Sequence, residues 1–312
     1  MQYSVDVVLL TYKPQEQVFN LIEALENQTY PLRKIIIINT EEKYFDRLFY
    51  GTGFLEKYKN IEVHHISAKE FDHGRTRNKA VKYSKADMFV CMTHDAVPND
   101  ENLIENLVSA VTAEKSIAAA YARQLPLPDC REIEKYTRSF NYPEESQVKA
   151  YSDIKKLGIK TFFCSNVCAI YKREIFDEIG GFVKKAIFNE DMIYAANAIN
   201  KGYKISYAAQ AQVLHSHNYT CMQQLRRNFD LGVSQAEHPE IFENISSESE
   251  GIKLVKDTIK HLCITKNKRL IPYLIVSSAY KYLGYQLGTH YKSLPYGIIK
   301  KCSSNKTYWK EL

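Results

Sequence analysis

The sequence predicts an α/β fold: a Rossmann-like, doubly wound and mainly parallel sheet flanked by helices, followed by a basic helical tail. Apolar runs and helical patterns alternate over the first 125 residues, the alternation resumes up to residue 235, and the residues from 249 onward are helical and rich in Tyr and Lys. Strands that alternate with helices pair in parallel through right-handed crossovers. Such sheets bind ligands beyond the carboxyl ends of their strands, so the residues that follow each strand are the first candidates for a site.

The first half contains the clearest elements. Residues 5–11 form a near-continuous apolar run, typical of a strand that is covered on both faces. Residues 15–27 place Val18, Leu21, Ile22 and Leu25 at helical spacing. By the same criteria, further strands are expected at 34–39, 61–66, 87–92 and 117–122, and further helices at 74–84 and 99–113.

The second half is less regular. Residues 124–151 are predicted to form loops, one of which could act as a lid. Strands are expected at 160–171, 204–209 and 212–215, and helices at 173–179, 190–201 and 221–235. The expected division is a catalytic domain over residues 1–240 and a helical region over residues 241–312.

Composition excludes several classes of protein. The 312 residues are 45% hydrophobic and 25% charged, as in ordinary globular proteins. The longest apolar run, residues 270–280, ends at Lys281 and contains Pro272, so no stretch reaches the roughly 18 apolar residues of a spanning helix. The amino terminus lacks the basic start of a signal peptide, and the seven cysteines form no CxxC pair. We therefore expect a cytoplasmic protein without a disulfide framework.

The charge is unevenly distributed. The formal charge is +6, but residues 253–312 carry +10 and the preceding residues carry −4. A basic tail after an acidic body predicts a surface that meets an anionic partner, such as a phospholipid leaflet, nucleic acid or a phosphorylated acceptor. The alternative is a solvated helical face.

Polar residues follow the first two strands. Thr11 and Tyr12 end the first strand, and Asn39, Thr40 and Glu41 end the second. Side chains at adjacent strand tips can hold a nucleoside base and ribose. The alternative is that these are ordinary polar strand ends.

A second cluster opens the helix at residue 74. His73, Gly74, Arg75, Arg77 and Asn78 combine a helix amino terminus with two guanidinium groups. Backbone amides, the helix dipole and arginine forks together suit a diphosphate. A capped helix with surface arginines is the alternative.

The remaining clusters contain acids and imidazoles. His94 and Asp95 follow a strand, and an acid at that place can bind a divalent cation. The alternative is that Asp95 is a cap or turn residue before Pro98. Glu190 and Asp191 open a helix, where one can act as a general base, or both can favour the helix dipole. Two further histidines, His215 and His217, point the same way if the segment is extended, either as metal ligands or as core residues.

Taken in order, these clusters resemble the inverting family 2 glycosyltransferases over residues 4–235. The resemblance rests on VVLLTYK, FDHGRTRN, THDAVP, GGF followed by NED, and QQLRRNFDLG. It implies the GT-A fold, a Rossmann-like doubly wound mixed sheet. The FDHGRTRN and HDAVP segments most resemble bacterial rhamnosyltransferases that use dTDP-L-rhamnose to build cell-wall or capsular polysaccharide.

The resemblance also implies roles for the residues. Asp95 matches the last acid of the family's DxD metal motif, and Thr93 stands where the first acid usually lies, so a site for Mg²⁺ or Mn²⁺ is one carboxylate short. His215 and His217 stand where related enzymes bring an imidazole to the cation. Asp191 matches the catalytic base, with Glu190 as its neighbour. The acceptor segment of the family corresponds to Gln223, Arg226 and Arg227.

The implied acceptor is a glycan on a polyprenyl diphosphate carrier or an oligosaccharide, at the inner face of the cell membrane. The basic tail fits a peripheral contact with that membrane, packing on the body, or a homo-oligomer. Two alternatives remain: a UDP-hexose or UDP-N-acetylhexosamine donor, and a non-catalytic protein that binds sugar nucleotides or glycans. Nucleic acid is not an expected partner, because the body is acidic and carries no recognised motif.

Overall fold

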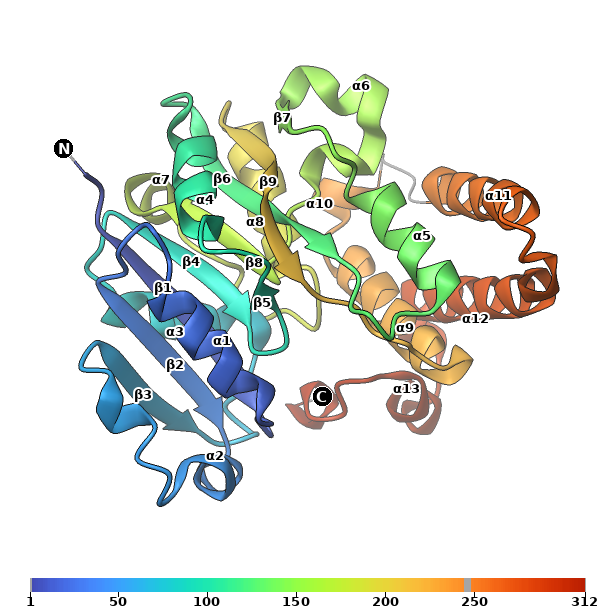
Figure 1. Ribbon diagram of the computed structural model, residues 1–312. Helices are drawn as coiled ribbons and strands as arrows, with labels where there is room; N and C mark the ends of the chain where they lie inside the picture. Colours follow the sequence, from blue (N-terminus) through green and yellow to red (C-terminus); the bar gives the residue numbers. More distant parts are fainter. Residues whose placement is uncertain (1, 244–247, 312) are drawn as a thin grey trace.

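Four parallel strands form one half of the sheet. In the computed structural model, which describes residues 2–243 and 248–311, they are β1 (Val5–Tyr12), β2 (Lys34–Thr40), β3 (Ile61–Ile66) and β4 (Met88–Thr93). They lie in the order β3-β2-β1-β4 (Figure 1). Their carboxyl ends therefore share one edge of the sheet.

The other half of the sheet is mixed. β8 (Cys168–Lys172) runs antiparallel between β4 and β6 (Ile117–Leu125), while β9 (Lys204–Leu214) is parallel to β6. Two short strands, β5 (Val97–Pro98) and β7 (Gln147–Lys149), run antiparallel to β9. The reversal at β8 gives the mixed, doubly wound sheet that the resemblance implied, and this prediction is confirmed.

Helices cover both faces of the sheet, and the alternation of side chains along β1 divides the core accordingly. Val7 and Leu9 pack in one cluster with α1 (Gln17–Glu26) and α4 (Leu103–Thr112). Val8 and Leu10 face the opposite cluster. The helices that contribute to that second cluster include α3 (His73–Tyr83), α7 (Arg173–Ile179) and α8 (Glu190–Asn200).

Several segments differ from the sequence-based expectation. Residues 160–171 are not one strand: the 3₁₀ helix Gly158–Phe162 comes first, and only Cys168–Lys172 joins the sheet. The cause is the buried Lys149, whose ammonium donates to the carbonyls of Lys160 and Phe163 and holds them in a turn. Residues 204–214 form one strand with a register irregularity instead of two strands.

Further helices lie where loops were expected or were not singled out. They are α2 (Glu42–Phe49), α5 (Glu132–Asn141), α6 (Ile154–Leu157) and α10 (Pro239–Phe242). The expected helix at 221–235 is α9, which spans Cys221–Glu237.

The carboxyl-terminal region packs on α9. It comprises α11 (Glu248–Ile264), α12 (Ile271–Thr289) and α13 (Tyr296–Cys302), and Figure 1 shows α12 returning from the end of α11 to lie beside α9, with α13 following it. Glycines allow α12 and α9 to touch: a Cβ atom at Gly284 or Gly288 would lie 2.2 Å from the Leu225 carbonyl oxygen or 2.1 Å from that of Phe229. α12 therefore packs directly against α9.

The chain end is anchored in a small core of its own. Trp309 is fully buried among Ile187, Phe229, Val233 and Ile299. Within the described residues, no helix is long and apolar enough to cross a bilayer.

The contact between α9 and α12 generates a stability prediction. The Gly288→Ala variant should lose about 1–3 kcal/mol of unfolding free energy, because the new methyl group overlaps the Phe229 carbonyl. Gly251→Ala in α11 is the matched control: its Cβ meets nothing within 4 Å, and replacing a helical glycine should gain roughly 0.5–1 kcal/mol. Urea unfolding measures both changes, and equal stability of the two variants would contradict the close contact.

Candidate active site

The carboxyl edge of the parallel strands carries a cavity of about 430 Å³. Tyr12 and Thr40 line it from the ends of β1 and β2, and His73 lines it from the start of α3. The described residues that line it are Tyr12, Thr40, Ala68, Phe71, His73, Ile187, Phe188, Arg227, Asp230, Ser304, Asn305, Lys306 and Thr307. The volume and the mixture of aromatic and polar walls suit a small-molecule site.

Not every polar residue at this edge faces the cavity. Thr11 donates a 3.0 Å hydrogen bond to Asn39, whose amide contacts His65 at 3.1 Å, and both Thr11 and Asn39 are buried. The Glu41 carboxylate accepts from the backbone amide of Ala68 at 2.7 Å. These three side chains join neighbouring strand ends, while Tyr12 and Thr40 remain in the cavity wall.

The start of α3 is fastened to the loop before α8. The Asp72 carboxylate accepts from the amides of Arg75, at 2.8 Å, and Ala186, at 2.9 Å. Gly74 is required by packing, because a Cβ atom there would lie 1.9 Å from the Val183 carbonyl oxygen. The Asn78 side chain bonds to both the carbonyl and the amide of Phe182. Asp72 is a positioning residue that the sequence analysis did not select, although it is the expected N-cap type.

The two arginines of this segment have different surroundings. Arg75 is exposed, whereas Arg77 is 4% exposed and forms a 2.7 Å ion pair with Glu190, whose side chain is 6% exposed. The Asn166 amide donates to the same Glu190 oxygen at 3.0 Å. The structure therefore corrects the expectation that Arg77 faces a diphosphate: its guanidinium is turned into the protein. The spacing alone could not reveal this, because Glu190 lies more than a hundred residues away.

Asp191 follows Glu190 in the sequence, at the start of α8. One of its carboxylate oxygens accepts from the Asn166 backbone amide at 2.7 Å. Burial and the negative charge of Glu190 raise the pKa of Asp191 above its ordinary value. Burial alone would also raise the pKa of Glu190, but the adjacent Arg77 outweighs it and lowers that pKa. The pair thus combines an acid whose ionised form is favoured with one whose pKa is raised, as suits a proton acceptor.

Asp95, His215 and His217 form a second cluster. The Asp95 carboxylate lies 3.2 Å from Nε2 of His217 and 3.6 Å from Nε2 of His215, and one ligand atom from each residue falls within 4.8 Å of the others. Burial acts to raise the pKa of Asp95, but the two imidazoles hold it well below its usual range. The adjacent His94 is turned away, with Nδ1 3.3 Å from the Leu10 carbonyl.

The donor set of this cluster fits a divalent cation. Arg138 can only donate hydrogen bonds, so the Gln124 atom that it contacts is the amide oxygen, Oε1. The same oxygen lies 2.9 Å from Nδ1 of His215, and because an amide oxygen only accepts, Nδ1 must carry the proton. Nε2 of a neutral His215 then presents a lone pair toward Asp95. Two imidazole nitrogens and a carboxylate oxygen that converge suit a divalent transition metal such as Mn²⁺ better than Mg²⁺, which prefers oxygen ligands. The Gln124 contact is the outer bond that orients such a histidine.

One short loop contacts both clusters. Ser165 accepts from the Gln124 amide at 3.0 Å, Asn166 holds Asp191, and Val167 accepts from the backbone amide of Thr93 at 3.2 Å. Gln124 contacts His215, and Thr93 lies two residues before Asp95. The loop at residues 165–167 therefore links Asp191 indirectly, by hydrogen bonds, to the cluster that contains Asp95.

The expected acceptor residues separate in the structure. Gln223 caps α9 by accepting from the amide of Thr220 at 2.8 Å, and Arg226 donates to the carbonyl of Lys301 at 3.2 Å. Arg227 instead lines the cavity, with its guanidinium 4.8 Å from the Tyr219 ring centre. Arg227 therefore lies in the same cavity as Tyr12, Thr40 and His73, which were expected to hold the nucleotide. Gln223 and Arg226 instead bond to the backbone of neighbouring segments.

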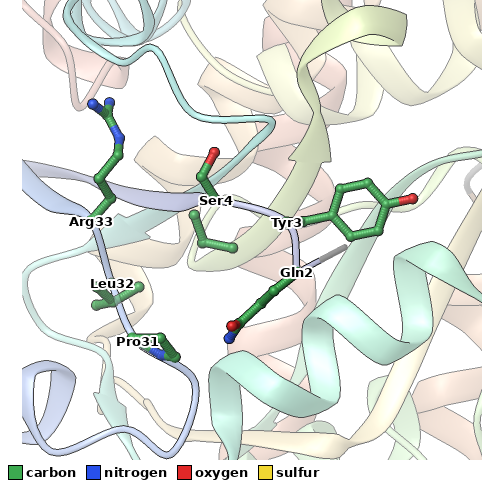
Figure 2. A pocket seen from close by; sticks show the side chains of 7 residues that line it. Gln2, Tyr3, Ser4, Pro31, Leu32 and Arg33 are labelled. Atoms are coloured by element: carbon green, nitrogen blue, oxygen red, sulfur yellow. The ribbon is translucent and has the colours of Figure 1, made fainter.

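A second hollow, of about 270 Å³, lies at the opposite end of β1 and β2. Figure 2 shows Arg33 extending away from Gln2 and Pro31, and its Nε donates to Asp6 at 3.0 Å. Because ligands of doubly wound sheets bind at the carboxyl edge, this hollow has no part in the site.

Two solved structures share the fold. The mannosyltransferase PcManGT from Pyrobaculum calidifontis, in complex with GDP-Man and Mn²⁺, superposes with a TM-score of 0.56 at 14% identity, covering 99% of this chain and 85% of that one. S. aureus TarS 1–349 gives a TM-score of 0.52 at 14% identity, with 93% and 91% covered. At these identities the likeness shows the fold, which is of the GT-A class.

Sequence relatives identify the family within this class. The glycosyl transferase family 2 model matches residues 6–180. The O-antigen chain rhamnosyltransferase RfbN of Salmonella typhimurium is 39% identical over 99% of this chain and 96% of its own length. The O-antigen chain rhamnosyltransferase WbaN of Salmonella anatum is 40% identical over 93% and 90%. The chain belongs to glycosyl transferase family 2, an inverting family, as its sequence segments indicated.

The charge of Glu190 predicts a pH effect on sugar transfer. A general base must be ionised, so with Asp191 in the role that the sequence analysis expects, its raised pKa makes activity fall as the pH drops through that value. Glu190→Gln removes the neighbouring negative charge and should shift the acid limb of the kcat/KM profile to lower pH by roughly one unit. Thermal melting of the variant serves as the control for folding, and an unmoved acid limb in a folded variant would contradict the coupling.

Proposed function

We propose that the protein transfers L-rhamnose from dTDP-β-L-rhamnose to a glycan acceptor with inversion, in the synthesis of an O-antigen or a similar cell-surface polysaccharide. The near full-length likeness to two O-antigen chain rhamnosyltransferases supports the sugar and the polymer class. The observation that carries the mechanism is the loop at Ser165–Val167, which connects Asp191 with the Asp95 cluster. In this proposal residues 1–240 carry the chemistry.

The reaction is a single displacement at the anomeric carbon. The Asp191 carboxylate takes the proton of an acceptor hydroxyl while that oxygen bonds to the anomeric carbon. The bond from this carbon to the diphosphate breaks on the opposite face, its electron pair leaves with the nucleoside diphosphate, and a β-linked donor gives an α-linkage. A positioned base of this kind contributes about 10²–10⁴-fold to the rate.

The leaving diphosphate requires positive charge. Asp95, His215 and His217 would hold a Mg²⁺ or Mn²⁺ ion, and a cation bound there neutralises charge on the leaving group. The two imidazoles take the place of the first acid of the family motif, where this chain has Thr93. Exposed Arg75 and cavity-lining Arg227 are the arginines available to the phosphate oxygens.

Nucleoside diphosphate release from dTDP-L-rhamnose, with and without Mn²⁺ or Mg²⁺, tests this proposal. Wild-type protein should release dTDP in the presence of acceptor, and Asp191→Asn should lower turnover by at least about 10²-fold, because the amide cannot accept the proton. Donor affinity of the variant should stay within a few-fold, since the base acts on the acceptor.

A parallel panel of UDP-hexose and UDP-N-acetylhexosamine donors identifies the sugar nucleotide. Preferred release of UDP would contradict the rhamnose donor. Near-normal turnover of Asp191→Asn would place the base elsewhere, and binding of donors without any release would indicate a non-catalytic protein.

We also propose that the carboxyl-terminal helices contact the anionic inner surface of the membrane, where a polyprenyl-diphosphate-linked acceptor would lie. Ile275, Val276, Tyr282 and Leu283 of α12 are 49–59% exposed, and their spacing of seven residues places them on one helix face. Exposed basic residues flank this face at Lys266, Lys268 and Arg269. An apolar stripe with basic flanks is typical of peripheral membrane helices.

Vesicle co-sedimentation tests the membrane contact. Wild-type protein should sediment with vesicles that contain phosphatidylglycerol, more strongly at low salt, and the double variant Ile275→Glu/Leu283→Glu should not, because it places two acids on the apolar stripe. Tyr50→Glu, at an 89% exposed tyrosine beyond α2, is the control for adding an acid elsewhere. Equal sedimentation of the double variant and the control would contradict the proposed surface.

A further inference from the structure

One wall of the cavity comes from the far end of the chain. Tyr12 and Thr40 line it from the sheet, and residues 304–307, which follow α13, line it from the other side. Figure 1 shows the chain returning from α12 through α13 toward the catalytic body, where it ends. Segments that are nearly three hundred residues apart therefore enclose the same space.

Hydrogen bonds to Asp230 of α9 hold the start of this segment. Ser303 is fully buried and donates to Asp230 at 2.6 Å, and the backbone amide of Ser304 donates to the other carboxylate oxygen at 2.9 Å. Asp230 is itself only 3% exposed. Both of its oxygens are thus engaged by the chain end.

The end of the segment is anchored as firmly. Trp309 is fully buried, and the Tyr308 hydroxyl donates to Glu237 at 2.7 Å. Asn305 closes the turn between the two anchors by accepting from Thr307 at 2.7 Å and from the Tyr308 amide at 3.2 Å. Residues 304–307 are therefore held at both ends, as a preformed strap across the cavity.

The charge of the cavity favours an anion. Arg227 and Lys306 are cations in its lining, and Asp230, which already accepts two hydrogen bonds from the strap, is its single acid. Aromatic rings at Tyr12, Phe71 and Phe188 provide faces for a base. Two cations beside aromatic walls match the chemistry of a nucleoside diphosphate.

We infer that the strap, residues 304–307, completes the donor site and that Lys306 contacts the diphosphate of the bound sugar nucleotide. This inference rests on the proposed function, because it takes the cavity to be the donor site. It makes the carboxyl terminus a part of the binding site, although no group that performs the displacement lies there.

Calorimetric titration with dTDP in the presence of Mn²⁺ tests the role of Lys306. Lys306→Ala should bind dTDP at least about tenfold more weakly than wild type, the loss expected for one hydrogen bond to a charged group. Lys301→Ala is the matched control, because it removes the same charge from an exposed site of α13 outside the cavity, and it should bind as wild type does. Equal affinity of all three proteins would overturn the contact.

Hydrogen exchange of the wild-type protein tests the strap without any substitution. The peptide that spans residues 303–309 should exchange more slowly when dTDP is added, while a peptide from α11 should not change. Unchanged exchange of the strap under saturating dTDP would overturn its place in the site. Wild-type protein that binds no nucleoside diphosphate would instead contradict the proposed function, so the two failures are distinguishable.

Discussion

The buried ion pair between Arg77 and Glu190 is the interaction on which the candidate site depends. It joins α3, which follows the third strand, to the start of α8, which precedes the last long strand, and both side chains are almost inaccessible to water. Removing one partner of such a pair leaves an uncompensated charge, at a cost of about 3–5 kcal/mol. The pair also sets the electrostatics of Asp191, because Arg77 keeps Glu190 ionised and that negative charge then raises the pKa of Asp191.

Around this pair, a few backbone segments position groups for both halves of the reaction. Asn166 uses its side chain for Glu190 and its backbone amide for Asp191, so one neutral residue holds both acids. The residues on either side of Asn166 reach Gln124 and Thr93, and through them the imidazole and carboxylate of the second cluster. One loop thus links the proposed base to the proposed cation ligands through hydrogen bonds of three consecutive residues.

The carboxyl-terminal region has a different relation to the site from the one its composition suggested. Its positive charge predicted a surface that meets an anionic partner, and the exposed apolar stripe of α12 is the surface that we propose for the membrane contact. The opposite side of α12 uses Gly284 and Gly288 to approach α9, and the chain then returns to the cavity through Asp230 and Trp309. Helices outside the sheet therefore serve both as a support for α9 and as a wall of the cavity.

The sequence by itself determined most of the long strands, most helices, the mixed doubly wound class and the family, because these follow from local periodicity and from short segments such as FDHGRTRN. It also located the acids and imidazoles at strand and helix ends. Only the tertiary structure decided which arginine is buried, that Gln124 orients His215, and that the chain end closes the cavity. The physical reason is that each of these depends on a contact between residues from about 75 to nearly 300 positions apart, and such pairings leave no trace in a local pattern of apolar and charged residues.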